Sequence, residues 1–384
     1  MRRLFLHIGA HKAGTTALQE SLSHGRAQLE SLGLSYVTTP LLVHLHSFLE
    51  PQAPAAHVPQ GFTVRDPAAL ATALSSAPLA NVVASSENFS FLFQPEPIAG
   101  LERALRPHFD EIRILSYLRR QDRHAVSHHQ EGARPRRRAE GDLWGHAPNA
   151  LPDPSPAQDL YLDYDRRLGL WADVFGPDCL DLRVYDRKRL RQGDILADFL
   201  ALIGLDQAGL ATVGDKNISL GAAQTKVGHL MNGLGITALV ADAVLERIGT
   251  EGRLLPSQDQ ARAFLDRYRA SNRRLNARFR ITDLPDLFDD DFDDFPADPH
   301  GDWTENTANA ALRACLAQTQ EVAPAPSGLT ADDLRDAAIA LQHKRPQTAL
   351  RLITVAQALR PEGAAIVRLK AELEAKLTAT RPPP

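Results

Sequence analysis

The stretch from Arg3 to Leu22, RLFLHIGAHKAGTTALQESL, constrains the fold of this chain most strongly. Its first residues are apolar and predict a buried strand, a short loop with two glycines follows, and apolar residues at helical spacing predict an amphipathic helix beyond the loop. A strand that enters a helix through small residues leaves backbone N–H groups unpaired at the helix N-terminus, and these donors favour bound anions together with the helix dipole. Lys12 adds a positive charge, and Thr15 and Thr16 add hydroxyl donors, so the stretch predicts an anion-binding site.

Length and charge exclude several classes of protein. A chain of 384 residues is expected to hold two or three domains, or one large domain with an appendage. Its 43 basic and 47 acidic residues nearly balance, so no general attraction to nucleic acid is expected. The sequence lacks a run of about 18 apolar residues, which predicts that it has no membrane span.

The cysteines and the first residues bear on the compartment. Cys179 and Cys315 lie far apart in the sequence, which predicts no disulfide framework and fits a reducing compartment. The first residues, MRRLFLH, lead directly into the first strand, which does not fit a signal peptide. A cytoplasmic protein is therefore expected.

Polar residues follow a second predicted strand at the point where it ends. The sequence NVVASSENF, which begins at Asn81, reads as a buried strand that ends in polar residues. Ligands of open α/β sheets bind at the carboxyl ends of the strands. The four polar residues from Ser85 to Asn88 are therefore expected to face the same crevice as the Lys12 loop.

A third predicted strand, Glu111 to Leu118, leads directly into a run rich in arginine. Seven arginines lie between Arg119 and Arg138, against only two acidic residues. Such a run is either a solvated basic helix and loop or a second phosphate site at a strand-to-helix junction.

The loop pattern resembles that of a known enzyme family. It differs from the nucleotide triphosphatase form G-x-x-x-x-G-K-[ST], because Lys12 precedes the second glycine and Thr15 follows that glycine directly. The pattern G-x-x-K-x-G-T-T resembles the 5′-phosphosulfate loop of sulfotransferases that use 3′-phosphoadenosine 5′-phosphosulfate (PAPS). Arg119 and Ser127, eight residues apart after a strand, resemble the 3′-phosphate motif of the same family. The resemblance covers roughly Arg3 to Arg280.

This resemblance implies a fold and an activity. The fold would be three-layer α/β/α, with a mainly parallel central sheet and a P-loop-like strand–loop–helix. The activity would be in-line transfer of a sulfuryl group from PAPS to a hydroxyl or amine acceptor, with a saccharide as the first guess, adenosine 3′,5′-bisphosphate as the product and no metal required. Lys12 would lie by the bridging oxygen as a catalytic residue. The residues that the resemblance places at the PAPS site are Gly9, His11, Lys12, Ala13, Gly14, Thr15, Thr16, Arg119, Ser127 and Asn217.

The transfer also needs a general base within hydrogen-bond reach of the acceptor. Glu87 and His46 are the candidates, with His44 behind them. Glycan sulfotransferases often carry Glu after their second strand, where this chain has His instead. Glu87 is favoured because its strand is expected to open into the crevice.

The sequence also predicts the structure of two later segments. Gln258 to Phe279 reads as one charged helix that packs on the core. The acidic run from Phe288 to Phe295 lacks the spacing of a calcium loop and its closing Glu. It is better read as a solvated segment that can fold back on the arginine-rich surface.

The end of the chain reads as a separate helical piece. Residues 1–305 are expected to form the sulfotransferase domain, 306–328 a linker, 329–378 a helical segment and 379–384 a disordered tail. The spacing of Ala and Leu in the helical segment resembles one tetratricopeptide repeat plus a cap. A single repeat is marginal alone, so it is expected to dock on the main domain or on a protein partner.

Three other functions compete with sulfuryl transfer as interpretations of the sequence. A P-loop kinase or nucleotide triphosphatase is disfavoured because Lys12 is misplaced and no strand ends in an obvious Mg²⁺-binding Asp. An inactive sulfotransferase-like scaffold would make the C-terminal helices the working part, although Lys12, Arg119 and Ser127 are all present. Nucleic-acid binding through the arginines would predict salt-sensitive binding to any polyanion.

Overall fold

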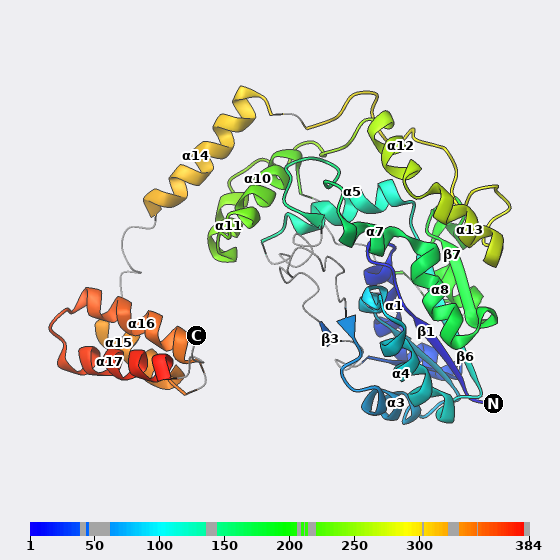
Figure 1. The fold of residues 1–384 in the computed structure, drawn as a ribbon, viewed down its shortest axis with the longest axis horizontal. Helices are drawn as coiled ribbons and strands as arrows, with labels where there is room; N and C mark the ends of the chain where they lie inside the picture. Colours follow the sequence, from blue (N-terminus) through cyan, green and yellow to red (C-terminus); the bar gives the residue numbers. More distant parts are fainter. Residues whose placement is uncertain are drawn as a thin grey trace. The chain divides into compact units, whose positions relative to one another are not determined.

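A computed structural model gives the fold of the chain (Figure 1). It divides into two compact units, Met1–Ala314 and Cys315–Pro384, and each is described by itself. The residues that the structure describes are 1–38, 44–45, 62–135, 144–205, 209–210, 212–213, 220–301, 303–321, 330–343 and 345–379.

The first unit is built around a five-stranded sheet in the order β2-β5-β1-β6-β7, in which every neighbouring pair is parallel. The central strand is β1, whose Leu6 lies between Ala84 of β5 and Ile114 of β6. The loop that follows β1 therefore leaves the middle of the carboxyl edge of the sheet. The strands are β1 (Arg3–His7), β2 (Leu34–Val37), β5 (Asn81–Ser85), β6 (Glu111–Leu118) and β7 (Leu180–Val184).

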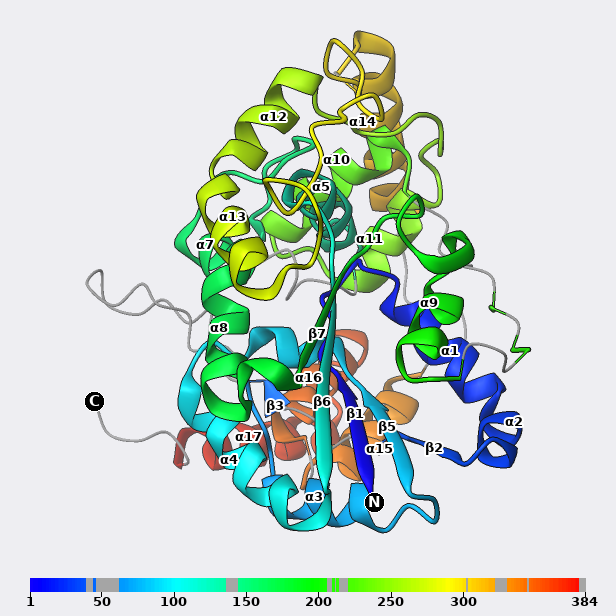
Figure 2. The same ribbon diagram turned by 90° about the vertical axis from the view of Figure 1, so that its right-hand side faces the viewer.

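Helices cover both faces of this sheet (Figure 2). Because successive side chains of a strand point to opposite faces, Leu4 and Leu6 pack into one apolar cluster and Phe5 packs into another. The first cluster includes helices α3, α4 and α8, and the second includes α1, α2 and α9. The predicted three-layer α/β/α architecture is confirmed. These helices are α1 (Thr15–His24), α2 (Arg26–Ser31), α3 (Pro67–Ser75), α4 (Pro95–Leu105), α8 (Tyr164–Phe175) and α9 (Ile195–Leu202).

The first unit contains further elements outside the central sheet and the six helices that pack on it. A short antiparallel pair joins β3 (His44–Leu45) to β4 (Phe62–Thr63). The remaining helices are α5 (Gln121–Gly132), α7 (Pro156–Leu162), α10 (Ala222–Gly233), α11 (Ala238–Leu245), α12 (Gln258–Asp266) and α13 (Arg269–Phe279), with short 3₁₀ turns η1 (Glu87–Phe91), η2 (Arg106–His108), η3 (Pro177–Cys179) and η4 (Arg191–Gly193).

The prediction of one helix from Gln258 to Phe279 is wrong, because the chain forms α12 and α13 with a break between them. The break coincides with two side chains that bind the same carboxylate. Arg267 donates to Asp159 of α7 at 2.6 Å, and the hydroxyl of Tyr268 donates to the same oxygen at 2.8 Å. The break thus lies where residues of this segment contact α7, and the spacing of apolar residues in the sequence does not predict such contacts between distant segments.

The second unit holds α15 (Ala331–Leu341), α16 (Pro346–Leu359) and α17 (Ala364–Ala379), which pack around Ala338, Ile353 and Ile366. A helix, α14 (Glu305–Glu321), occupies much of the stretch predicted as a linker and crosses the boundary between the units. The likeness to a tetratricopeptide repeat stays a prediction, and the predicted tail lies outside the described residues except for Ala379. Among the helices of the described ranges, none has the length and apolar character needed to cross a membrane.

Candidate functional site

The loop between β1 and α1 has an unusual backbone. Gly9, Lys12 and Gly14 have positive φ angles of 88°, 56° and 79°, a region that L side chains adopt at a cost. Both glycines also lie against other parts of the chain. A Cβ on Gly9 would lie 2.8 Å from the Cα of Glu87, and one on Gly14 would lie 2.6 Å from the ring of Tyr185. The two glycines are therefore required by the path of the loop and by its close neighbours.

The loop presents backbone donors at the start of α1. The N–H of Ala10 donates to the carbonyl of Tyr117, and the N–H of His11 donates to the hydroxyl of Tyr161. The N–H groups of Gly14, Thr15 and Thr16 have no hydrogen-bond partner among the described residues, and Gly14 caps the helix without a side-chain bond. Such donors, at the positive end of the helix dipole, are suited to an anionic ligand.

Arg119 lies directly against this loop. Its Nη1 donates to the carbonyl of Lys12 at 2.9 Å, and its guanidinium lies 6.0 Å from the ring centroid of Tyr185. The hydroxyl of Tyr164 donates to the carbonyl of Arg119 and fixes the backbone where β6 ends. Burial, together with the positive charge of Arg123, lowers the pKa of Arg119. This cation would gain from a nearby anion, because it has no carboxylate partner in the described part of the chain.

Helix α5 carries Ser127 to the same place. Lys12 forms an ion pair with Glu131 of α5, with 3.6 Å between Nζ and Oε2. The ring of His11 stacks on the ring of His128 at a centroid distance of 5.1 Å. Because Ser127 precedes His128 and lies one turn before Glu131, it belongs to the part of α5 that meets the loop. The structure thus places Lys12, Arg119 and Ser127 at the same edge of the sheet.

Glu87 lies at this edge as well, at the start of η1 and beside Gly9. Gln19 of α1 donates to its carboxylate at 2.8 Å. Burial raises the pKa of the Glu87 carboxyl, but the nearby His11 ring and hydrogen bonds from the backbone and Gln19 outweigh burial, so that the net pKa is lowered. The side chain is therefore a carboxylate at neutral pH and able to accept a proton.

The structure does not describe the side chains of three other candidates. His46 and Asn217 lie outside the described residues, and only the backbone of His44 is described, in β3. The sequence interpretation did not find Gln19, Tyr161 or Glu131. For Glu131 a signal existed, because it follows Ser127 by one helical turn.

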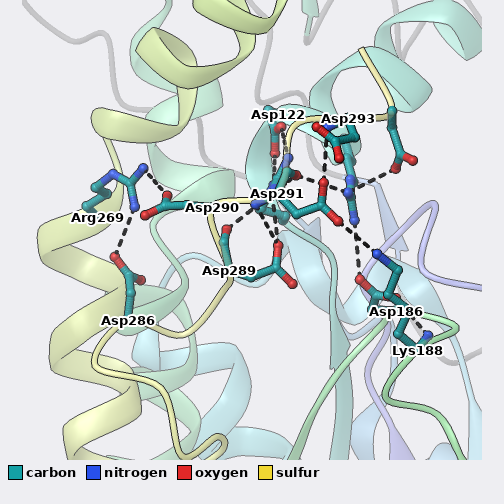
Figure 3. A network of polar contacts seen from close by, with 12 residues as sticks. Asp122, Asp186, Lys188, Arg269, Asp286, Asp289, Asp290, Asp291 and Asp293 are labelled. Carbon is teal, nitrogen blue, oxygen red and sulfur yellow. Dashed lines mark hydrogen bonds and ion pairs between the residues drawn. The ribbon is translucent and has the colours of Figure 1, made fainter.

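The acidic segment from Asp289 to Asp294 folds back on basic residues, as the sequence favoured (Figure 3). Asp289 pairs with Arg120 at 3.1 Å, Asp291 with Lys188 at 2.8 Å, and Asp294 with Arg123 at 2.9 Å. Hydrogen bonds from Lys188 and from the backbone of Asp293 lower the pKa of Asp291 to about 2.

A cavity of about 530 Å³ lies in the same unit, and no predicted site residue lines it. Its walls include Lys226, Leu254, Phe264 and Arg267. Gln130 of α5 donates to the carbonyl of Leu254 at 2.6 Å. A residue of the cavity wall is therefore hydrogen-bonded to α5, but no residue of the Lys12 loop lines the cavity.

Comparisons with known proteins find only limited similarity to this chain. No family model matches the chain. An uncharacterized protein of Archaeoglobus fulgidus is 29% identical over 124 residues, a match that spans 30% of this chain and about a third (34%) of the length of that relative. A solved structure, a sulfotransferase from Alicyclobacillus acidocaldarius, is 15% identical, with 62% of this chain and 96% of that chain covered and a TM-score of 0.36. That score is too low to establish a shared fold. The described part of the chain is a three-layer α/β protein with a parallel sheet.

The close packing around Gly14 generates a prediction. Gly14→Ala should lower the free energy of unfolding by more than Gly33→Ala, as measured by urea denaturation. Both residues have positive φ angles, so both variants should lose about 1 kcal/mol to backbone strain. A Cβ on Gly33 meets nothing within 4 Å, whereas a Cβ on Gly14 would overlap Tyr185 and Ile195. Equal losses in the two variants would contradict the packing described here.

The lowered pKa values of two buried histidines predict how the free energy of unfolding depends on pH. Burial lowers the pKa of His7 and of His129 to about 4, against an ordinary value of 6.5. Between these values the unfolded chain binds protons that the folded chain does not. The free energy of unfolding should therefore be highest above pH 6.5 and should fall as the pH drops towards 4. The decrease should be up to about 1.4 kcal/mol per pH unit for each histidine.

The predicted pH dependence is checked by measuring the free energy of unfolding between pH 7.5 and 4.5. The His7→Asn variant is compared with His108→Asn, a variant of an exposed histidine. His7→Asn should make the decline shallower, and His108→Asn should leave it as it is. An unchanged slope in the His7 variant would show that this ring does not cause the decline.

Proposed function

We propose that the protein is a sulfotransferase that moves a sulfuryl group from PAPS to a hydroxyl or amine of an acceptor, with a saccharide as the first candidate. The observation that supports the proposal is that Arg119 and helix α5, which carries Ser127, both contact the Lys12 loop beside the open N-terminus of α1. Two groups of anion donors would then serve one site, which suits a nucleotide that carries negative charge at both ends. Composition alone would not predict such a pair of sites, because the net charge of the chain is −4.

Each residue has a role in the proposal. The open amides of α1, with Thr15 and Thr16, would hold the 5′-phosphate, and Gly9, His11, Ala13 and Gly14 would shape the loop around it. Arg119, through its guanidinium fork, and Ser127, through its hydroxyl, would hold the 3′-phosphate. Asn217 is assigned to the same site on the resemblance alone.

The reaction would be an in-line displacement at sulfur. The bond from sulfur to the bridging phosphate oxygen breaks, a bond from sulfur to the acceptor oxygen or nitrogen forms, and the electron pair of the broken bond leaves with adenosine 3′,5′-bisphosphate. Lys12 would neutralise the negative charge that develops on the leaving oxygen. As in phosphoryl transfer, most of the catalysis would come from positioning and electrostatic stabilisation.

The proton of the acceptor must also be removed. We propose that the Glu87 carboxylate accepts it, supported by the ionised state of Glu87 and its position beside Gly9. Gln19 would orient the carboxylate through its hydrogen bond. His46 is the alternative base.

The main alternative is a P-loop kinase or nucleotide triphosphatase. In those proteins the lysine follows the second glycine of the loop and enters the helix. Here Lys12 precedes Gly14, has a left-handed backbone and reaches α5. These features favour the phosphosulfate loop over the triphosphate loop.

Ligand binding separates these proposals. The melting temperature of the full chain should rise with adenosine 3′,5′-bisphosphate and should not rise with ADP and Mg²⁺. At 100 times its dissociation constant the ligand should stabilise the fold by about 2.7 kcal/mol. Arg119→Ala and Ser127→Ala should weaken this effect, because each removes one proposed phosphate donor.

Ser76→Ala serves as a control outside the proposed phosphate site, because this exposed hydroxyl donates to the carbonyl of Thr72 at the end of α3. It should keep the response to the bisphosphate. A rise with ADP and Mg²⁺ alone would favour the triphosphatase. No rise with either ligand would favour the scaffold, whose working part would be the C-terminal helices.

A second experiment tests the base. Glu87→Gln should lower turnover about 100- to 10,000-fold and spare bisphosphate binding, because a general base acts on the acceptor and not on the nucleotide. Transfer of radiolabelled sulfate from PAPS to a panel of saccharides measures turnover. Near-normal turnover in this variant would remove Glu87 as the base, and His46→Asn would then be the variant expected to lose activity.

A further inference from the structure

We propose that Arg123 is a further phosphate-binding side chain of the nucleotide site and that the carboxylate of Asp294 competes with the phosphate for it. The proposal rests on the proposed function, because it takes Arg119 and Ser127 as receivers of a phosphate group. It adds a third donor, and a second cation, to that group. It also adds an internal anion, carried by the acidic segment from Asp289 to Asp294.

The position of Arg123 supports the first part. Arg123 and Ser127 are one helical turn apart on α5 and therefore share a face. Arg119 and Arg123 also meet adjacent residues at the end of β7. The guanidinium of Arg119 lies 6.0 Å from the ring centroid of Tyr185, and Nη1 of Arg123 lies 3.2 Å from a carboxylate oxygen of Asp186.

The two guanidinium groups are close enough to affect each other, since the charge of Arg123 contributes to the lowered pKa of Arg119. Two neighbouring cations of this kind repel each other unless an anion lies near both. A phosphate dianion can accept hydrogen bonds from two arginine forks at once. The pair is therefore suited to a phosphate group.

The charges around Arg123 support the second part. Its guanidinium has two carboxylate partners, Asp186 at 3.2 Å and Asp294 at 2.9 Å. Asp186 has 15% of its side chain exposed, whereas Asp294 has 69% exposed. Ion pairs with a well-exposed partner contribute little, so a doubly charged phosphate should displace Asp294 and leave Asp186 in place.

The acidic segment can release Asp294 without leaving the surface. Asp289 is anchored on the buried Arg120, and Asp291 on Lys188 (Figure 3). Phe292 is buried, and Arg120 lies 4.3 Å from the centroid of its ring. With these anchors kept, only the side chain of Asp294 has to turn towards water.

The test measures the binding of adenosine 3′,5′-bisphosphate to the full chain by titration calorimetry, in Asp294→Asn and in Asp290→Asn. The two variants are a matched pair. Both remove one negative charge from the same segment, and the two side chains are 69% and 71% exposed, but Asp290 pairs with Arg269 of α13. Asp294→Asn should raise the affinity up to about fivefold, and Asp290→Asn should change it little.

Arg123 is tested by two variants. Arg123→Gln should lower the affinity at least about tenfold, because it removes a charged hydrogen-bond donor. Arg123→Lys, which keeps the charge but not the fork, should lose less. In the Arg123→Gln background the gain from Asp294→Asn should disappear, since the two side chains then no longer compete. The melting temperature of each variant shows whether it is folded.

The outcomes separate this proposal from the function on which it rests. If the wild-type chain binds no bisphosphate, the proposed function fails and this proposal fails with it. If the wild-type chain binds it, equal gains in the two aspartate variants would point to a general effect of net charge and overturn the competition. Unchanged affinity in the folded Arg123→Gln variant would remove Arg123 from the site.

Discussion

The burial of β1 on both faces is the constraint on which the site depends. Leu4 and Leu6 enter one apolar cluster and Phe5 enters the other, so a shift of this strand by one residue would exchange these side chains between the clusters and disturb the packing of both. Its neighbours β5 and β6 are parallel to it. All three strands therefore end at one edge, where the Lys12 loop, Glu87 and Arg119 leave the sheet. The arrangement of these polar residues follows from the packing of the apolar ones.

Helix α5 connects this edge to the rest of the unit. One side of it meets the Lys12 loop through His128 and Glu131. Val126 belongs to a separate apolar cluster that includes Leu265 of α12 and Phe292 of the acidic segment. The helix is thus fixed by apolar contacts away from the loop. This packing holds the side chains that meet the loop in place.

The sequence predicted the parts of the structure that local patterns determine. The bounds of β6 and the strand–loop–helix at the start both follow from the pattern of apolar residues and glycines. It could not predict contacts between residues far apart in the chain. The hydrogen bond from Gln19 to Glu87 and the break near Tyr268 depend on how elements pack, and no local pattern reports packing. The roles of individual site residues stay predictions for the same reason, since geometry limits a role without assigning it.

The pairing of β1 also has a consequence for how the protein is made. Leu6 lies beside Ala84 and Ile114, residues that are synthesised much later than the loop that follows β1. Parallel pairing over such separations requires the closure of long segments and is slow. During translation β5 is available to β1 before β6, so until β6 and α5 have left the ribosome β1 has only one of its two neighbouring strands. The anion site is consequently a property of the completed unit, and the short stretch that predicts it in the sequence cannot form it alone.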